Sequence, residues 1–63
     1  MWLAKDKDGV FIFENKPERY DINSSFEILS GFYFEIPQQL VFEILGKNLY
    51  ISDVPIEIEI RKI

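Results

Sequence analysis

The residues best placed for chemistry near the start of the chain are two aspartates in the string Asp-Lys-Asp-Gly over residues 6–9. Asp-x-Asp-Gly occurs in EF-hand calcium loops, where carboxylate oxygens at fixed spacing hold the ion. The rest of that pattern is missing, because its first ligand position falls on Ala4 and its closing glutamate on Asn15. Asp before Gly is also common turn chemistry, since Asp accepts a nearby backbone N–H and Gly adopts positive φ. The string therefore predicts a turn, and we expect no metal.

Carboxylate pairs are the second set that could do chemistry. Glu57 and Glu59 alternate along the last apolar stretch and Glu35 lies in another, and two carboxylates can serve glycoside hydrolysis. A solvated strand face is the favoured interpretation, because such catalysis needs a substrate cleft that so small a domain can hardly enclose. The chain has no His and no Cys, so the usual nucleophile–base relays are missing. The sequence predicts a protein that is not an enzyme and uses no cofactor.

Length and composition limit how this chain can be stabilised. Its 63 residues form one domain, residues 1–63, close to the lower limit at which a core alone supports folding. Without Cys or His, neither disulfides nor Cys- or His-ligated metals can add stability. Stability must come from a core built on six Phe, three Tyr and one Trp, and a homo-oligomer is a second source.

Charge and hydropathy limit the classes of partner that the chain can bind. The net charge of −4 argues against direct binding to nucleic acid. No stretch is long enough to span a bilayer, and the chain does not open with a basic segment followed by an apolar one. We expect a cytoplasmic protein without membrane contacts.

The turn at residues 6–9 sits between two apolar stretches, which predicts a β-hairpin over residues 2–14. A type I turn with Gly9 at positive φ gives a three-residue loop with a bulge. In that register Asp6 faces Val10 and Trp2 faces Glu14. Both faces are then apolar, so we expect cover on both sides. One face carries Leu3, Phe11 and Phe13, and the other carries Trp2, Ala4, Val10 and Ile12.

Three further apolar stretches, residues 31–36, 49–52 and 55–63, alternate or are rich in β-branched and aromatic residues, which predicts strands. In the first, Phe32, Phe34 and Ile36 are expected to face the core. Residues 15–23 around Pro17 read as a loop, with Tyr20 as a candidate cover for the sheet together with Ile22.

Two segments fit both helix and strand. Residues 24–30 fit a short capped helix or an extended segment, with the extended form slightly favoured. Residues 38–45 lie between Pro37 and Gly46, which favours a helix, yet their apolar residues also alternate. The favoured interpretation is one helical turn over residues 37–40 and an extended segment over 42–45. The whole pattern predicts an all-β domain, a small twisted antiparallel sheet or open barrel of about five short strands with one helical turn. The alternative is α+β with a short helix near 38–45.

The two ends of the chain also carry a family resemblance. Residues 2–9 read Trp-Leu-Ala-Lys-Asp-Lys-Asp-Gly, residues 13–17 read Phe-Glu-Asn-Lys-Pro, and residues 55–59 read Pro-Ile-Glu-Ile-Glu. The chain thereby resembles a set of small uncharacterised proteins of bacteria and their phages that open with Trp-Leu-Ala-[Arg/Lys]-Asp-x-Asp-Gly and end in a Pro-x-Glu-Val-Glu-like strand. The resemblance implies a phage or prophage origin and supplies no catalytic residue.

The candidate binding surface is the sheet face opposite the core, because aromatic residues ringed by polar ones are typical of protein-binding patches. The sequence predicts a non-enzymatic protein-interaction module with an unknown protein partner. The alternative for this face is a second small core under the middle of the chain. Two other functions stay open: a structural homo-oligomer that pairs through edge strands, and an acidic inhibitor of a nucleic-acid-binding protein. The candidate face consists of Trp2, Tyr33, Tyr50, Glu35 and Glu57.

Overall fold

One open antiparallel sheet organises the molecule. The computed structural model describes residues 1–59, and within them the sheet has four strands in the order β3-β2-β1-β4. The predicted small antiparallel sheet with a helical element is thus confirmed, and residues 60–63 of the predicted last strand lie outside the described residues. The elements are β1 (Trp2–Asp6), β2 (Gly9–Phe13), β3 (Tyr33–Ile36), α1 (Gln38–Leu45) and β4 (Ile56–Glu57).

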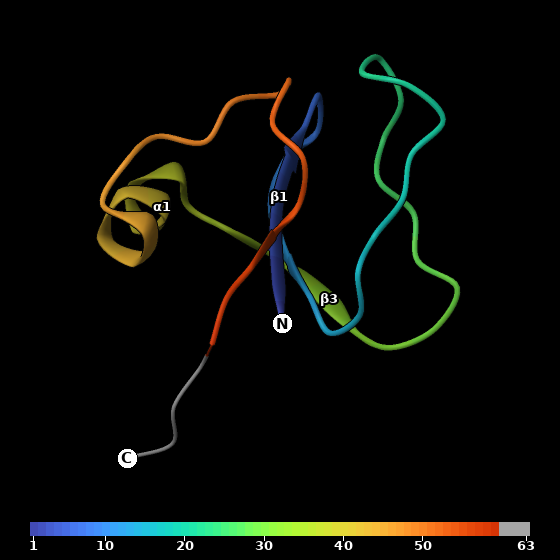
Figure 1. Ribbon diagram of the computed structural model, residues 1–63, viewed down its shortest axis with the longest axis horizontal. Coiled ribbons are helices and arrows are strands. Elements are labelled where there is room, and N and C mark those ends of the chain that lie inside the picture. The colour runs from blue at the N-terminus through green and yellow to red at the C-terminus, as the bar shows by residue number, and fades with distance from the viewer. Residues whose placement is uncertain (60–63) are drawn as a thin grey trace.

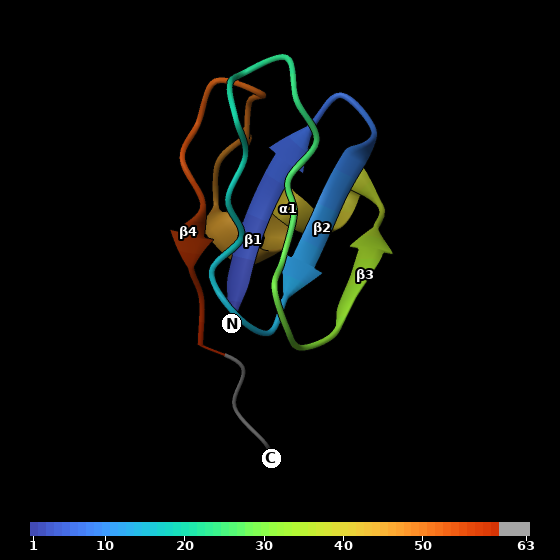
Figure 2. The same ribbon diagram turned by 90° about the vertical axis from the view of Figure 1, so that its right-hand side faces the viewer.

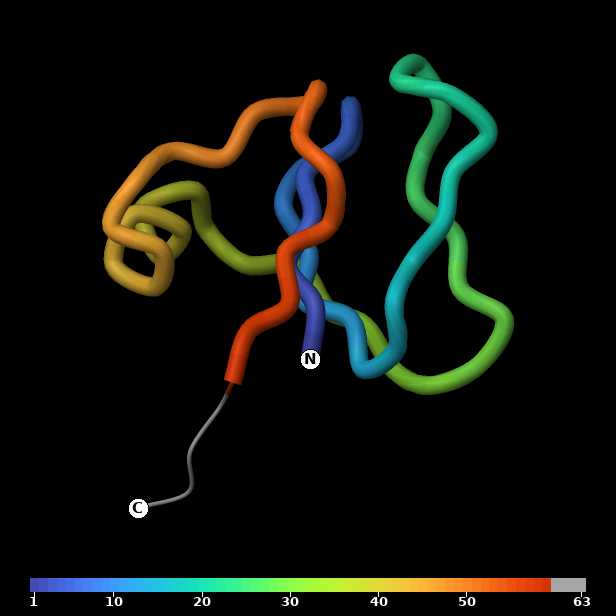
Figure 3. The backbone as a smooth tube through the Cα atoms, in the orientation of Figure 1, coloured from blue at the N-terminus to red at the C-terminus, as the bar shows by residue number. Residues whose placement is uncertain are grey.

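The sheet separates two unlike layers. α1 lies on one face, and the long connection between β2 and β3, residues 14–32, lies on the other (Figure 1). We call this connection the excursion. Seen face-on, it crosses in front of β1 and β2 while β3 stands clear of it (Figure 2). Its two limbs run side by side (Figure 3) and are joined where Glu18 and Glu27 exchange backbone hydrogen bonds of 2.9 and 2.7 Å. Residues 24–30 form no helix, and this isolated bridge is their one extended feature.

The β1–β2 hairpin differs from the predicted register by one residue. Gly9 has the predicted positive φ, at 140°, but it pairs directly with Asp6 across a two-residue loop, so no bulge forms and Trp2 faces Phe13. Because side chains alternate along a strand, this single step exchanges the faces of the whole of β2. The core face therefore carries Leu3, Val10 and Ile12, and the opposite face carries Trp2, Ala4, Phe11 and Phe13.

The main core lies between the sheet and α1. The helix begins after Pro37 and ends at Gly46, whose φ of 70° and N–H bond of 2.7 Å to the Phe42 carbonyl close the last turn. The helical alternative for residues 38–45 is confirmed, and the extended segment over 42–45 is wrong. The physical reason is burial along one side of the helix: Val41 is fully buried, and Leu45, one turn later, packs against the core. A strand would instead have buried the alternating apolar residues of this segment, and these are exposed. The buried cluster is Leu3, Val10, Ile12, Ile36, Val41 and Leu49.

Residues 49–52, predicted as a strand, form a turn instead. The Tyr50 N–H donates to the Asp53 carboxylate at 2.8 Å, and the Asp53 N–H donates to the Tyr50 carbonyl at 3.0 Å. A side-chain acceptor three residues ahead competes with strand pairing for the same backbone donor. The chain then enters β4, where Ile56 pairs with Leu3.

The edge strand β3 leaves apolar side chains uncovered. Phe32 and Phe34, predicted to face the core, are 44% and 47% exposed and stack on each other at 6.1 Å. Only Ile36, at the end of β3, is buried. No helix among residues 1–59 has the length and apolar character needed to cross a membrane.

Candidate functional site

Four of the five residues predicted for the binding face share the sheet face opposite α1. Trp2 and Tyr33 are the direct neighbours of Phe13 on its two sides, and Glu57 pairs with Trp2. Glu35 lies one row further along β3. The fifth residue, Tyr50, is not on this face, because it belongs to the turn at residues 50–53 and not to a strand of the sheet.

The β1–β2 part of this face is a small second core beneath the excursion. Phe13 is 2% exposed and Trp2 is half-buried, with the Lys16 ammonium 5.5 Å from the centre of the indole ring. The cover comes from the buried Pro17 and from Phe26, whose ring meets Phe13 edge-on at 6.3 Å. Tyr20 and Ile22 are not the cover, contrary to prediction: they are 94% and 47% exposed.

Tyr33 lies at the open side of the same face. Its ring stacks on Phe13 at 5.8 Å with an interplanar angle of 22°, and it meets Phe11 edge-on at 6.0 Å. The ring is held on these two neighbours, yet Tyr33 is 58% exposed. The excursion thus covers Trp2 and Phe13 and leaves the β3 side of the aromatic face accessible.

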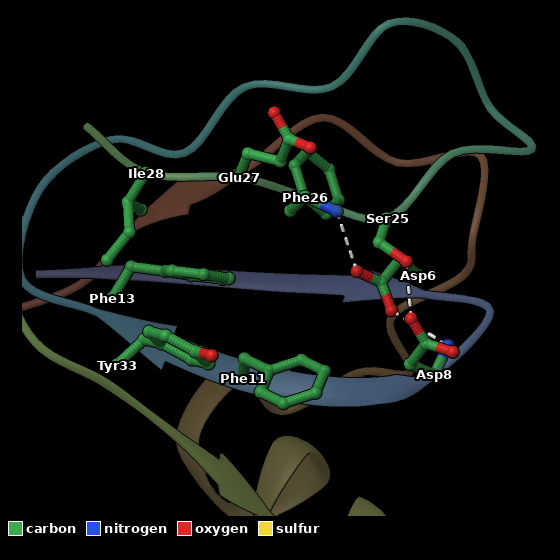
Figure 4. A pocket seen from close by; sticks show the side chains of 9 residues that line it. All are labelled: Asp6, Asp8, Phe11, Phe13, Ser25, Phe26, Glu27, Ile28 and Tyr33. Atoms are coloured by element: carbon green, nitrogen blue, oxygen red, sulfur yellow. Dashed lines mark hydrogen bonds between the residues drawn. The ribbon is translucent and has the colours of Figure 1, made fainter.

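Between the sheet and the excursion lies a cleft of about 430 Å³, shown in Figure 4. Phe11, Phe13 and Tyr33 line it from the sheet, and Phe26 and Ile28 line it from the excursion. Its volume falls within the range of small-ligand sites in proteins. We call this space, with Asp6, Asp8, Ser25 and Glu27 along its margin, the aromatic cleft.

Asp6 fastens the excursion to the hairpin at one end of the cleft. It is 3% exposed, and its two carboxylate oxygens accept the backbone N–H groups of Asp8 and Phe26, both at 2.8 Å (Figure 4). The Ser25 hydroxyl donates to the carboxylate of the exposed Asp8. The bond from the Asp8 N–H to Asp6 is the predicted turn chemistry. The bond from the Phe26 N–H to Asp6, which spans twenty residues, sets the position of Phe26 above Phe13.

Glu35 and Glu57, two of the three carboxylates that the sequence singled out, do not lie side by side. Glu35 lies on β3 and Glu57 on β4, the two edges of the sheet. Three strand spacings place them roughly 14 Å apart, whereas glycosidase carboxylates lie about 5 to 9.5 Å apart. Within residues 1–59, no group of three or more His, Cys, Asp or Glu side chains is placed to hold a metal ion.

Three aromatic residues of the site were not predicted as site residues. Phe11 and Phe13 were assigned to the face opposite Trp2, because the register was one residue off. Phe26 was placed in a segment that fits a short helix or an extended form, and neither pattern indicates that its ring lies on Phe13.

The charges around the aromatic cleft are of one sign. Asp6, Asp8 and Glu27 line it, and none of the lysines or arginines in residues 1–59 does so. Arg19 lies outside it: its guanidinium is 4.4 Å from the centre of the Phe26 ring and donates to the Ile51 carbonyl at 2.6 Å. The cleft thus combines aromatic walls with acidic margins.

Comparison with known proteins finds no matching family model, no similar curated protein and no similar solved structure. The resemblance carried by the two ends of the chain therefore stays a prediction.

Proposed function

We propose that this protein is a non-enzymatic protein-interaction module and that the aromatic cleft, with Tyr33 at its rim, is the binding site. The observation that carries the proposal is the state of Tyr33, packed on the buried Phe13 but 58% exposed. A ring already held by its neighbours loses little conformational freedom when a partner covers it. Tyrosine is among the residue types that dominate binding energy at protein interfaces.

The acid–base chemistry of the sheet supports the non-enzymatic part of the proposal. Glu35 and Glu57, two of the candidate carboxylates of the sequence, lie on opposite edges of the sheet. Asp6 is engaged by two backbone N–H groups that hold the excursion in place. Asp6 thus has a structural position, and Glu35 and Glu57 are exposed on separate edges of the sheet.

Two tyrosines give the proposal a matched test. Tyr33 and Tyr50 are 58% and 60% exposed, but only Tyr33 lies at the cleft. Immobilised wild-type protein and the variants Tyr33→Ala and Tyr50→Ala are used to capture proteins from a bacterial lysate, chosen because the chain resembles bacterial and phage proteins. A protein recovered with the wild type is then purified, and its Kd for all three is measured by titration calorimetry.

We expect Tyr33→Ala to weaken binding at least about tenfold, the effect of an interface anchor, and Tyr50→Ala to change the Kd less than twofold. Equal affinity for all three proteins would refute the assignment of the cleft. A wild-type protein that captures nothing beyond an unrelated control domain of similar charge would refute the function itself.

A further inference from the structure

The aromatic cleft has a charge pattern that selects its ligand. The rings of Phe11 and Tyr33 form one wall, and the exposed carboxylate of Asp8 lies at the end of that wall (Figure 4). The faces of aromatic rings carry partial negative charge and attract cations. With acidic residues at the margin and no lysine or arginine of residues 1–59 lining it, the cleft is complementary to a positive group.

The chain's own cations already use this face of the sheet and its cover in the same way. Lys16 lies over the Trp2 ring and Arg19 over the Phe26 ring. Both contacts lie outside the aromatic cleft, because neither cation lines it. The aromatic cleft thus also offers ring faces to a cation, but no lysine or arginine of residues 1–59 lines it.

We propose that the aromatic cleft binds an arginine side chain presented by a partner protein, with the guanidinium against Phe11 and Tyr33 and paired with Asp8. A guanidinium is planar and weakly hydrated, so it stacks on rings and loses less on leaving water than an ammonium does. Asp8 is the partner rather than Asp6, because Asp6 is buried and both of its oxygens already accept backbone N–H groups. The inference rests on the proposed function and specifies the partner's chemistry.

The test needs no identified partner. Blocked pentapeptides Gly-Gly-X-Gly-Gly, with X arginine, lysine, citrulline or norleucine, are titrated into the ¹⁵N-labelled full chain and followed by amide NMR shifts. Citrulline keeps the shape of arginine without its charge, and norleucine tests plain apolar filling. We expect the arginine peptide to shift the amides of Phe11, Phe26 and Tyr33 and to bind in the millimolar range. The citrulline and norleucine peptides should bind at least about fivefold more weakly, and the lysine peptide should fall between.

Two charge variants separate a direct contact from the general field of an acidic protein. Asp8→Asn and Glu43→Gln each remove one negative charge, but Glu43 is an exposed residue of α1 on the other side of the sheet. Asp8→Asn should weaken arginine binding at least threefold, while Glu43→Gln should leave it nearly unchanged. Tyr33→Leu keeps an apolar wall and removes the ring, and it should weaken the arginine peptide without affecting the norleucine peptide. Amide spectra with wild-type dispersion confirm that each variant is folded.

Each alternative outcome is decisive. Equal binding of arginine and norleucine peptides would overturn the inference and indicate an apolar ligand, and equal binding of lysine and arginine would overturn the choice of guanidinium. No shift at the cleft with any peptide at 20 mM, a limit set as about tenfold above a millimolar Kd, would also overturn it. None of these results affects the Tyr33 and Tyr50 comparison with a captured protein, so failure of the inference and failure of the proposed function are distinguishable.

Discussion

Asp6 provides the sharpest test of how the excursion is held on the β1–β2 hairpin. Its buried carboxylate accepts one N–H from within the turn and one from Phe26 in the excursion. A hydrogen bond to a charged group contributes about 1.5–3 kcal/mol, and both of these are partly buried. Removing both acceptors in Asp6→Ala should therefore lower the free energy of unfolding by about 3–6 kcal/mol. Asp6→Asn keeps one acceptor oxygen and should lose about half of that.

These losses are large for a domain of this size. At about 0.05–0.15 kcal/mol per residue, a 63-residue chain has a total stability of roughly 3–9 kcal/mol. Asp6→Ala can then be largely unfolded at room temperature, and Asp6→Asn is the variant on which the measurement rests. Asp8→Asn is the comparison within the same turn, because Asp8 is exposed and its bond to the excursion comes from the Ser25 hydroxyl, whereas the buried Asp6 holds the Phe26 backbone N–H.

Urea unfolding followed by the fluorescence of Trp2, the single tryptophan of the chain, gives the change in stability. Hydrogen exchange of the Phe26 amide reports the bond itself, since that amide donates to Asp6. We expect the wild type to be the most stable, Asp8→Asn to be less stable and Asp6→Asn to be the least stable of the three. The Phe26 amide should exchange its hydrogen fastest in Asp6→Asn. If Asp6→Asn and Asp8→Asn unfold at the same urea concentration and protect Phe26 equally, Asp6 does not hold the excursion.

Two further predictions concern the backbone and the core. Gly9→Ala should cost about 1–3 kcal/mol, because φ is 140°; the added Cβ also meets the Glu35 carboxylate, but that side chain can move, so combining Gly9→Ala with Glu35→Ala should not restore the urea midpoint. Val41→Ala should cost about 2–3 kcal/mol and lower Tm by roughly 15–20 °C, because Val41 is fully buried. Val54→Ala, at a valine that is 76% exposed, should leave Tm within about 4 °C in the same calorimetric scan.

The parts of the fold that sequence predicts correctly are those fixed by neighbours in the chain. The turn before Gly9 and the aromatic and β-branched stretch of β3 both depend on contacts within a few residues. The hairpin register does not, because residues 6–9 fit a two-residue and a three-residue loop equally well and Gly9 has positive φ in either. One residue of loop length then decides which face every side chain of β2 joins.

Two of the remaining errors have a tertiary cause, and one comes from a local side-chain bond. Residues 38–45 carry both a helical and an alternating pattern, and burial of Val41 against the sheet decides for the helix. At residues 49–52, the Asp53 side chain accepts the Tyr50 N–H, so a sequence with the pattern of a strand forms a turn. The aromatic cleft depends on contact between Asp6 and Phe26, twenty residues apart, which no local pattern indicates.

Folding of the excursion and binding at the aromatic cleft are thermodynamically linked through Asp6. The bond from the Phe26 N–H to Asp6 helps to hold the Phe26 wall of the cleft on Phe13. A ligand that fills the cleft stabilises this attached state according to its concentration and Kd. Conversely, a variant that detaches the excursion lowers apparent affinity by the fraction of molecules that remain attached. Loss of binding in Asp6→Asn would therefore not show that Asp6 contacts the ligand. Tyr33 separates contact from attachment, because its exposed ring lies at the rim and its removal leaves the bond between Asp6 and Phe26 in place.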